Sequence, residues 1–270
     1  MATPRPITFL SDYGYEDEFA GVCRAVISQI APGAPLIDLT HGIGRQDIRQ
    51  GAIALANALP SCPPGVHLAV VDPGVGSARR AVAVAAAEGR LLVGPDNGLL
   101  SRGLDRLGGA LDAVELSRSP FRLEPVSATF HGRDLFAPVA AHLSLGARLE
   151  EAGESIDPAS LATLDLPTPR ISDAEVVAHA IHQDAYGNVT LDLDTSMLRD
   201  GPIRQGDALE IRAPDGRFQG VWARTFADVG PSDVLLFEDS SGALALAVSG
   251  GSAAGLMNLG RDSELTLRPT

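Results

Sequence analysis

The alternation of short apolar runs with amphipathic segments over about the first 150 residues most constrains the fold. Apolar runs at Pro6–Leu10, Leu36–Leu39 and Val66–Val71 have the length and composition of buried strands. Between them, Phe19–Ile30 and Ile48–Leu59 carry apolar residues at helical spacing, and a proline follows each segment. Segments 81–87 and 91–93 continue the strand pattern, and 135–144 continues the helical one. Strands that alternate with helices predict an α/β domain with a mainly parallel central sheet, covered on both faces.

The pattern changes after about residue 157. Three X-Pro pairs, at Asp157-Pro158, Leu166-Pro167 and Thr168-Pro169, predict a linker. Beyond it, short Val/Leu/Ala-rich segments are separated by Gly, Asp, Ser or Pro, and they predict a smaller all-β barrel. These segments are 175–183, 189–194, 208–212, 220–224, 234–238, 243–248 and 265–267. We therefore expect an α/β domain over 1–157, a linker over 158–172 and a β-barrel domain over 173–270.

Charge and composition narrow the class of protein. The net charge of −13 includes no lysine, and the arginines are scattered, so nucleic acid is not an expected partner. The longest apolar stretches are too short to span a bilayer and no targeting segment opens the chain, so we expect a cytoplasmic protein without membrane association. Cys23 and Cys62 stand alone and predict neither a disulfide framework nor a zinc site.

Two short glycine-containing segments bring together a carboxylate, a guanidinium and an imidazole. Asp72 lies in Val70–Ser77, with Arg79 just beyond, and His131 lies in Thr129–Asp134. Asp72 ends an apolar run and precedes Pro and Gly, so we expect it where a buried strand ends, at the sheet edge where α/β proteins bind ligands. Taken singly, Asp72 is equally typical of a turn or helix cap, and His131 of a hydrogen-bonded core histidine.

Several ordered motifs together resemble the S-adenosylmethionine (SAM) hydrolase family, which shares its fold with the fluorinases and chlorinases. The resemblance covers nearly the whole chain and implies an N-terminal α/β domain and a C-terminal β-barrel. It also implies a homotrimer, with the substrate between one subunit's N-terminal domain and a neighbour's C-terminal domain. The motifs are Ser11-Asp12-Tyr13-Gly14, Thr40-His41, Val71-Asp72-Pro73-Gly74-Val75-Gly76, Gly94-Pro95-Asp96-Asn97-Gly98, Thr129-Phe130-His131-Gly132-Arg133-Asp134 and Tyr186-Gly187-Asn188.

The resemblance implies hydrolysis of SAM to adenosine and L-methionine without a metal or redox cofactor. The family's catalytic spacing is met by Asp72, by Arg79 seven positions later and by His131 59 positions later, and it selects Arg79 over its neighbour Arg80. Water must lose a proton as it attacks C5′ of the ribose, so Asp72 is the candidate base, His131 orients or relays, and Arg79 holds the water. A halide needs no deprotonation, so this triad favours hydrolysis over halogenation.

The same resemblance implies the substrate-binding residues. Asp12 would bind the ribose hydroxyls, and Asp17, Asp184 and Asn188 the methionine part. The adenine pocket would include Phe226, Ser240, Val248 and Gly250. Without the resemblance, Asp12 and Asn188 are equally typical of turns, Phe226 of a core aromatic and the glycine of a hairpin.

One segment departs from the family pattern. After Thr40-His41 the family has a proline followed by an aromatic residue near the ribose, whereas this chain has Gly42-Ile43-Gly44-Arg45-Gln46-Asp47. One wall of the pocket therefore differs. We expect His41 to be a strand-end histidine bonded to backbone.

Two other functions remain open. Asp12, Asp72, Asp96 and His131, all expected near strand ends, could form the metal cluster of a metal-dependent hydrolase, although they include no close-spaced ligand pair. Alternatively, the chain could be a nucleoside-binding or sensing module without catalysis, against which the intact Asp, Arg and His set argues.

Overall fold

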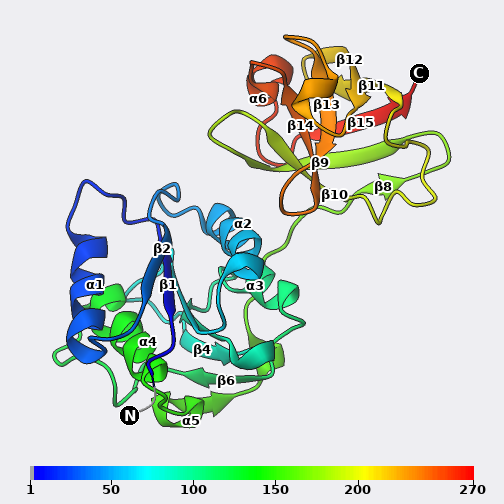
Figure 1. The fold of residues 1–270 in the computed structure, drawn as a ribbon. Helices are drawn as coiled ribbons and strands as arrows, with labels where there is room; N and C mark the ends of the chain where they lie inside the picture. The colour runs from blue at the N-terminus through cyan, green and yellow to red at the C-terminus, as the bar shows by residue number, and fades with distance from the viewer. Residues whose placement is uncertain (1–2) are drawn as a thin grey trace. The chain divides into compact units, whose positions relative to one another are not determined.

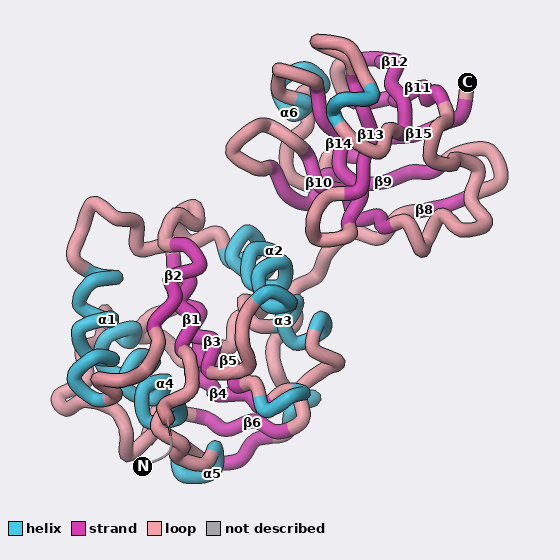
Figure 2. The backbone as a smooth tube through the Cα atoms, in the orientation of Figure 1, coloured by secondary structure: helices cyan, strands magenta, loops and turns pink. Residues whose placement is uncertain are grey.

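The computed structural model describes residues 3–270, and contacts divide the chain into two compact units, up to Leu164 and from Asp165 to Thr270. The division falls inside the segment expected to be a linker. Both figures that show the whole chain draw the first unit as a sheet with helices and the second as a strand-rich barrel (Figures 1 and 2).

A seven-stranded sheet organises the N-terminal unit, in the order β2-β1-β3-β5-β4-β6-β7. The first four strands in that order are parallel to one another, whereas β4, β6 and β7 continue the sheet in antiparallel fashion. The strands are β1 (Ile7–Ser11), β2 (Leu36–Thr40), β3 (Val66–Val70), β4 (Ala81–Ala85), β5 (Leu91–Pro95), β6 (Asp112–Glu115) and β7 (Glu154–Ile156). The parallel strands bring the ends of β1 and β3 to one edge.

Helices cover both faces of this sheet. Those of the unit are α1 (Phe19–Ile30), α2 (Ile48–Ala58), α3 (Ser101–Arg106), α4 (Ala137–Ser144) and α5 (Leu149–Ala152). In Figures 1 and 2, α1 and α4 lie on one side of the strands and α2 and α3 on the other. Because side chains alternate along a strand, Phe9 of β1 packs into the core under α1 and α4, and Leu10 into the core under α2 and α3.

The predicted α/β fold is confirmed, with differences of detail. The helix predicted over 135–144 is preceded by a π-helical turn, Gly132–Phe136, so helical structure begins directly after His131. The four-residue helix α5, and also α3, β6 and β7, were not predicted. α3 and β7 are short, and half of the four residues of β6, Asp112 and Glu115, are acidic, so none of the three gives a clear periodic pattern.

The C-terminal unit is a closed barrel, as predicted. Seven strands follow the order β10-β14-β13-β12-β11-β15-β9, and pairing of β9 with β10 closes the ring. β8 adds to β9 outside it. The unit comprises β8 (Arg170–Ile171), β9 (Val176–Gln183), β10 (Val189–Asp194), β11 (Ala208–Ala213), β12 (Gly216–Trp222), β13 (Val234–Glu238), β14 (Ala243–Val248), α6 (Ala253–Met257) and β15 (Glu264–Pro269). Alternate Leu, Val and Ala side chains of the strands fill the interior.

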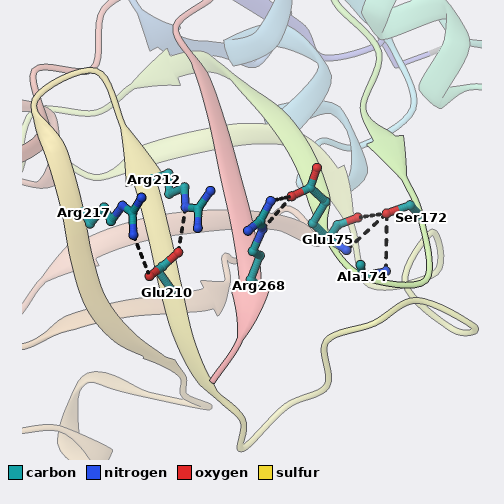
Figure 3. A network of polar contacts seen from close by, with 7 residues as sticks. All are labelled: Ser172, Ala174, Glu175, Glu210, Arg212, Arg217 and Arg268. Carbon is teal, nitrogen blue, oxygen red and sulfur yellow. Dashed lines mark hydrogen bonds and ion pairs between the residues drawn. The ribbon is translucent and has the colours of Figure 1, made fainter.

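Ion pairs join several of the barrel's strands at its surface (Figure 3). Glu175, just before β9, accepts a hydrogen bond from Arg268 Nε of β15 at 2.6 Å, and Glu210 accepts one from Arg212 Nε at 2.6 Å. Arg217 of β12 lies 3.8 Å from Glu210. Such exposed pairs contribute little stability each. Within residues 3–270 no helix is long and apolar enough to cross a membrane.

Candidate active site

A pocket of about 430 Å³ lies where β1 and β3 end in the N-terminal unit. Four of the predicted site residues line it: Asp12, Asp17, Asp72 and His131. The other lining residues are Tyr13, Phe19, Arg45, Gln46, Pro73, Val75, Thr129 and Gly132. The pocket thus combines three carboxylates with an imidazole and two aromatic rings.

Arg79 joins the two halves of the predicted catalytic set. Its Nε donates to Asp72 Oδ1 at 2.8 Å and its terminal nitrogen donates to Asp72 Oδ2. The same terminal nitrogen lies 2.9 Å from His131 Nδ1. The guanidinium also stacks on the ring of Phe136, 5.2 Å from its centroid. The three side chains are therefore in direct contact, and the guanidinium is held on both sides.

The contact between Arg79 and His131 defines the protonation of the imidazole. A guanidinium only donates hydrogen bonds, so Nδ1 of His131 must accept, which leaves the ring proton on Nε2. Burial, and secondly the positive charge of Arg79, lower the pKa of His131 below its usual 6.5. His131 is therefore neutral at pH 7 and presents an N–H donor. The single lone pair of Nδ1 is engaged by Arg79, whereas each Asp72 oxygen keeps a second lone pair beside its bond to Arg79, so Asp72 is the better proton acceptor.

Local structure explains why His131 lies at this point. It directly precedes the π-helical turn Gly132–Phe136, a distortion that often marks functional sites. Asp134, which is buried, pairs with Arg133 and accepts from the backbone N–H of Ser127 at 2.8 Å. Arg133 lies over the ring of Phe130. These contacts tie the 127–131 loop to the turn.

Asp12 directly follows β1, and its side chain contacts segment 42–47, where the sequence departs from the family pattern. Its Oδ2 accepts a hydrogen bond from the backbone N–H of Gln46 at 2.8 Å. Gln46 has a φ of 62°, which a non-glycine residue adopts only under constraint. Burial is the first cause of a raised pKa at Asp12, and the Gln46 hydrogen bond partly offsets it. Gln46 and Arg45 thus supply the wall for which the family has a proline and an aromatic.

Asp96 does not join the other carboxylates. It forms an ion pair with Arg80 and accepts from the backbone N–H of Ala162 at 2.7 Å, while Arg80 also donates to Ser160. Asp96 follows β5, which is parallel to β1 and β3, so it lies at the same sheet edge as Asp12 and Asp72, as expected. It does not line the pocket, because Arg80 and the 160–162 segment engage it. No group of three or more His, Cys, Asp or Glu side chains in the described chain is arranged to hold a metal ion.

A second cavity, of about 830 Å³, lies in the barrel unit. Every predicted C-terminal binding residue lines it: Asp184, Asn188, Phe226, Ser240, Val248 and Gly250. Phe226 is 40% exposed and leans on Phe237 with ring centroids 5.1 Å apart, so an aromatic surface remains accessible. Tyr186, Phe237, Asp239 and Gly251 complete the lining.

Asp184 and Asn188 also build the turn between β9 and β10. Asp184 Oδ1 accepts from the backbone N–H groups of Tyr186 and Asn188, both at 2.9 Å, and Oδ2 accepts from the Asn188 side chain at 2.8 Å. These bonds hold the exposed ring of Tyr186 at the cavity. The turn role considered for Asn188 is thus present together with its position in the lining.

Sequence reasoning missed lining residues that lie beside the predicted ones. Tyr13 follows Asp12, and Tyr186 lies two residues before Asn188. Proximity in the same motif could have indicated them. Arg45 and Gln46 lie in the segment whose departure from the family pattern pointed to a changed pocket wall, whereas Phe237 carried no such signal.

Comparison with known proteins supplies the family. The model described as "SAM hydroxide adenosyltransferase N-terminal domain" matches residues 7–153, and that of the C-terminal domain matches residues 178–266. The chain belongs to the SAM hydroxide adenosyltransferase family. It is 46% identical to the (R)-S-adenosyl-L-methionine hydrolase of Salinispora tropica, over 96% of each chain. The hydrolase of that name from Thermus thermophilus is 41% identical over 94% of this chain and 96% of its own length.

More distant relatives and solved structures agree with this membership. A fluorinase of Actinoplanes sp. is 26% identical over 89% of this chain and 90% of its own. The crystal structure of an uncharacterised conserved protein from Thermotoga maritima superposes with a TM-score of 0.91 at 32% identity, covering 97% of this chain and 99% of that one. The crystal structure of a conserved hypothetical protein from Thermus thermophilus gives a TM-score of 0.77 at 37% identity, with the same coverage. The resemblance to SAM hydrolases is therefore confirmed.

Proposed function

We propose that this protein hydrolyses SAM to adenosine and L-methionine by attack of water at C5′ of the ribose. The observation that carries the proposal is the Arg79 guanidinium, which bonds both the Asp72 carboxylate and the His131 imidazole at the N-terminal pocket. The high identity to hydrolases of this name over almost the whole chain supports it.

The reaction balances with the side chains present. The oxygen of water bonds to C5′ as the C5′–sulfur bond breaks. The electron pair of the broken bond passes to sulfur, which neutralises the sulfonium, and methionine leaves. The proton lost by the water goes to Asp72 and then to solvent. His131 donates through Nε2 and orients the water, and Arg79 stabilises the developing hydroxide charge. General-base assistance of this kind contributes roughly 10²–10⁴-fold.

The two cavities suit different parts of SAM. The carboxylates Asp12, Asp17 and Asp72 favour a cationic substrate, and Asp12 can accept bonds from both ribose hydroxyls. In the barrel unit, the ring of Phe226 can stack on adenine, and backbone groups near Val248 and Gly250 can form hydrogen bonds with the edge of the adenine ring. We assign the methionine ammonium to Asp17, Asp184 and Asn188. We propose a homotrimer in which both cavities serve one substrate. The cytoplasmic location remains a prediction.

The reaction is proposed to need no metal or redox cofactor, because a carboxylate takes the proton and methionine leaves as a neutral thioether. The deciding experiment incubates purified protein with SAM and a chelator in H₂¹⁸O. Adenosine labelled at its 5′ oxygen, released with equimolar unlabelled methionine, is the expected result. Loss of activity on chelation, restored by one divalent ion, would support the metal-dependent alternative, and binding without turnover would support the sensing module.

A matched pair of variants tests the assignment of Asp72. Asp72→Asn should lower kcat by roughly 10²–10⁴-fold. Asp96→Asn removes the same charge from the ion pair with the neighbouring arginine, and it should change kcat only by a factor of about two or three because Asp96 does not line the pocket. Equal losses in both variants would remove Asp72 from the chemical step.

A further inference from the structure

We propose that Ser11 and His41 are positioning residues, which hold the Asp12 carboxylate in place for the ribose from behind the pocket. The inference rests on the proposed function, in which Asp12 binds the ribose hydroxyls. Neither Ser11 nor His41 lines the pocket, and both side chains are completely buried, so they act only through the segment that contains Asp12.

The Ser11 hydroxyl encloses Asp12 in a tight turn. Its Oγ lies 2.7 Å from His41 Nδ1 and accepts a hydrogen bond from the backbone N–H of Tyr13 at 3.3 Å. The second bond spans Asp12, because it links the residue before it to the residue after it. The backbone of Asp12 is therefore fixed on both sides by one buried oxygen.

His41 orients that oxygen. Its Nε2 lies 3.3 Å from Asp38 Oδ1, an ion-pair contact without hydrogen-bond geometry, and the negative charge of the carboxylate favours the tautomer with the ring proton on Nε2. Nδ1 is then free to accept the hydrogen of Ser11 Oγ, which leaves the oxygen's lone pairs toward Tyr13 N–H. Arg24 of α1 lies 3.2 Å from Asp38 and completes the line of contacts. The ring of His41 thus bonds to the Ser11 side chain, and the backbone contact expected for this histidine is made by its carbonyl.

The backbone of His41 holds the rest of the same loop. Its carbonyl accepts from Gly14 N–H at 2.8 Å, and its own N–H donates to the Tyr15 hydroxyl at 3.3 Å. His41 also packs edge-on against Phe9 and Tyr15. One histidine at the end of β2 therefore fixes the loop from residue 11 to residue 15, with Asp12 inside it.

The same strand carries a matched control. Thr8 of β1 pairs through its hydroxyl with Nδ1 of His67 at 2.9 Å, and both residues are buried. The Thr8–His67 pair resembles Ser11–His41 in chemistry and burial. It lies on the opposite face of β1, three residues earlier, and neither member lines the pocket.

The test compares Ser11→Ala with Thr8→Val. Each substitution deletes one buried hydroxyl and leaves one histidine Nδ1 without its partner. For each purified full-length variant, kcat/KM is measured with SAM and with its 2′-deoxy and 3′-deoxy analogues. The ratio of ribose to deoxyribose substrate does not depend on the fraction of protein that is folded, so a purely structural loss leaves it unchanged.

Wild-type protein should prefer SAM over the deoxy analogues by roughly 10-fold to 100-fold, the effect of a charged hydrogen bond. Asp12→Ala should abolish that preference. Ser11→Ala should reduce it by roughly fivefold or more, mainly through KM, and Thr8→Val should keep the wild-type ratio. An unchanged ratio in Ser11→Ala, or an equal fall in Thr8→Val, would overturn the inference.

Two substitutions of His41 test the inference independently if Ser11→Ala folds poorly. His41→Asn places an amide near the position of Nδ1 and retains the Ser11 contact, whereas His41→Gln places its amide near Nε2 and loses it. The ribose preference should survive better in His41→Asn than in His41→Gln, and the reverse order would contradict the positioning role. A wild-type protein that releases no adenosine refutes the proposed function itself, whereas an active one with no ribose preference refutes only the role of Asp12.

Discussion

The hydroxyl of Tyr13 occupies the space that a side chain at Gly132 would need. A Cβ built on Gly132 would overlap Tyr13 Oη and lie 3.0 Å from Cζ of the same ring. Tyr13 follows Asp12, and Gly132 follows His131, so this contact joins the part of the pocket at Asp12 to the part at His131. Position 132 of the Thr-Phe-His-Gly-Arg-Asp motif must therefore be glycine, because Tyr13, which is far away in sequence, fills the space of any side chain there.

Gly132→Ala should therefore lower both stability and turnover. In an exposed helix interior, alanine would stabilise relative to glycine, but here overpacking against Tyr13 should reduce the free energy of unfolding by about 1–3 kcal/mol. Adding Tyr13→Phe removes the overlapping oxygen, so Gly132→Ala/Tyr13→Phe should recover part of the loss. Denaturant unfolding and kcat measure both effects, and strictly additive effects would show that the contact is not the cause.

The acid limb of the kcat profile should lie below the usual histidine range. The pKa of His131 is lowered from 6.5, so the neutral ring predominates at pH 6.5 and above, and the ring becomes mostly charged only at lower pH. Protonation there adds a positive charge beside Arg79 and removes the acceptor for its hydrogen bond, so kcat should fall. His131→Asn keeps an acceptor that does not titrate, and it should lose this limb. Rates are measured at saturating substrate, so that the titration of Asp12, which is proposed to affect binding, does not contribute to the kcat profile.

A different histidine should make stability depend on pH. Burial, with Arg90 as a second cause, lowers the pKa of His67 from 6.5 to about 4. The unfolded chain then binds a proton at higher pH than the folded one, so stability falls as the pH drops from 6.5 to 4, by up to about 3 kcal/mol. His67→Gln should remove this part of the slope. Equal pH dependence of unfolding in both proteins would contradict the lowered pKa.

Phe226→Ala should weaken binding of the adenine part without changing the chemical step. Loss of an aromatic stacking face should raise KM by roughly tenfold, equivalent to about 1.4 kcal/mol, with kcat nearly unchanged. Phe226→Tyr keeps the face and should behave like the wild-type protein. Isothermal titration with adenosine provides a second measurement. A fall in kcat at constant KM would place Phe226 outside the adenine site.

Complementation tests the proposed trimer. Asp72→Asn alters the N-terminal cavity, and Phe226→Ala/Asn188→Ala alters the one in the barrel unit. If each site combines cavities from neighbouring subunits in a closed ring, random reassembly of equal amounts should restore about a quarter of wild-type activity. Mixed oligomers confirmed by mass but without activity would show that each site is built within one chain.

The sequence predicted the elements that local patterns define. The helix from Phe19 to Ile30 and three of the barrel strands have the predicted bounds, because their apolar spacing and the turn residues around them agree. The predicted bounds of β12 were too late in the sequence. The strand begins at Gly216, where exposed arginine and glutamine side chains obscure the alternation of apolar and polar residues. Short elements such as β7 gain their stability from neighbours in the sheet, which local sequence does not reveal.

The site shows the same division. Motif spacing indicated Asp72, Arg79 and His131, which the fold brings into contact, but it gave no reason for Arg79 rather than Arg80 apart from the family resemblance. The choice depends on direction: adjacent side chains point to opposite sides, so Arg79 faces Asp72 while Arg80 faces Asp96. The position of Gln46 in the pocket wall depends on its backbone φ of 62°, and no pattern of residues in the sequence predicted that conformation.

The closed barrel sets the order in which the chain can fold during synthesis. All strands of the first sheet lie before residue 157, so that unit has its full set of partners once its own residues have left the ribosome. The barrel does not, because β15 (Glu264–Pro269), the last of its strands in sequence order, lies between β11 and β9. Until Glu264–Pro269 can pair, β9 and β11 each expose an unpaired edge, so a chain truncated before β15 would combine a complete α/β domain with an open, aggregation-prone sheet.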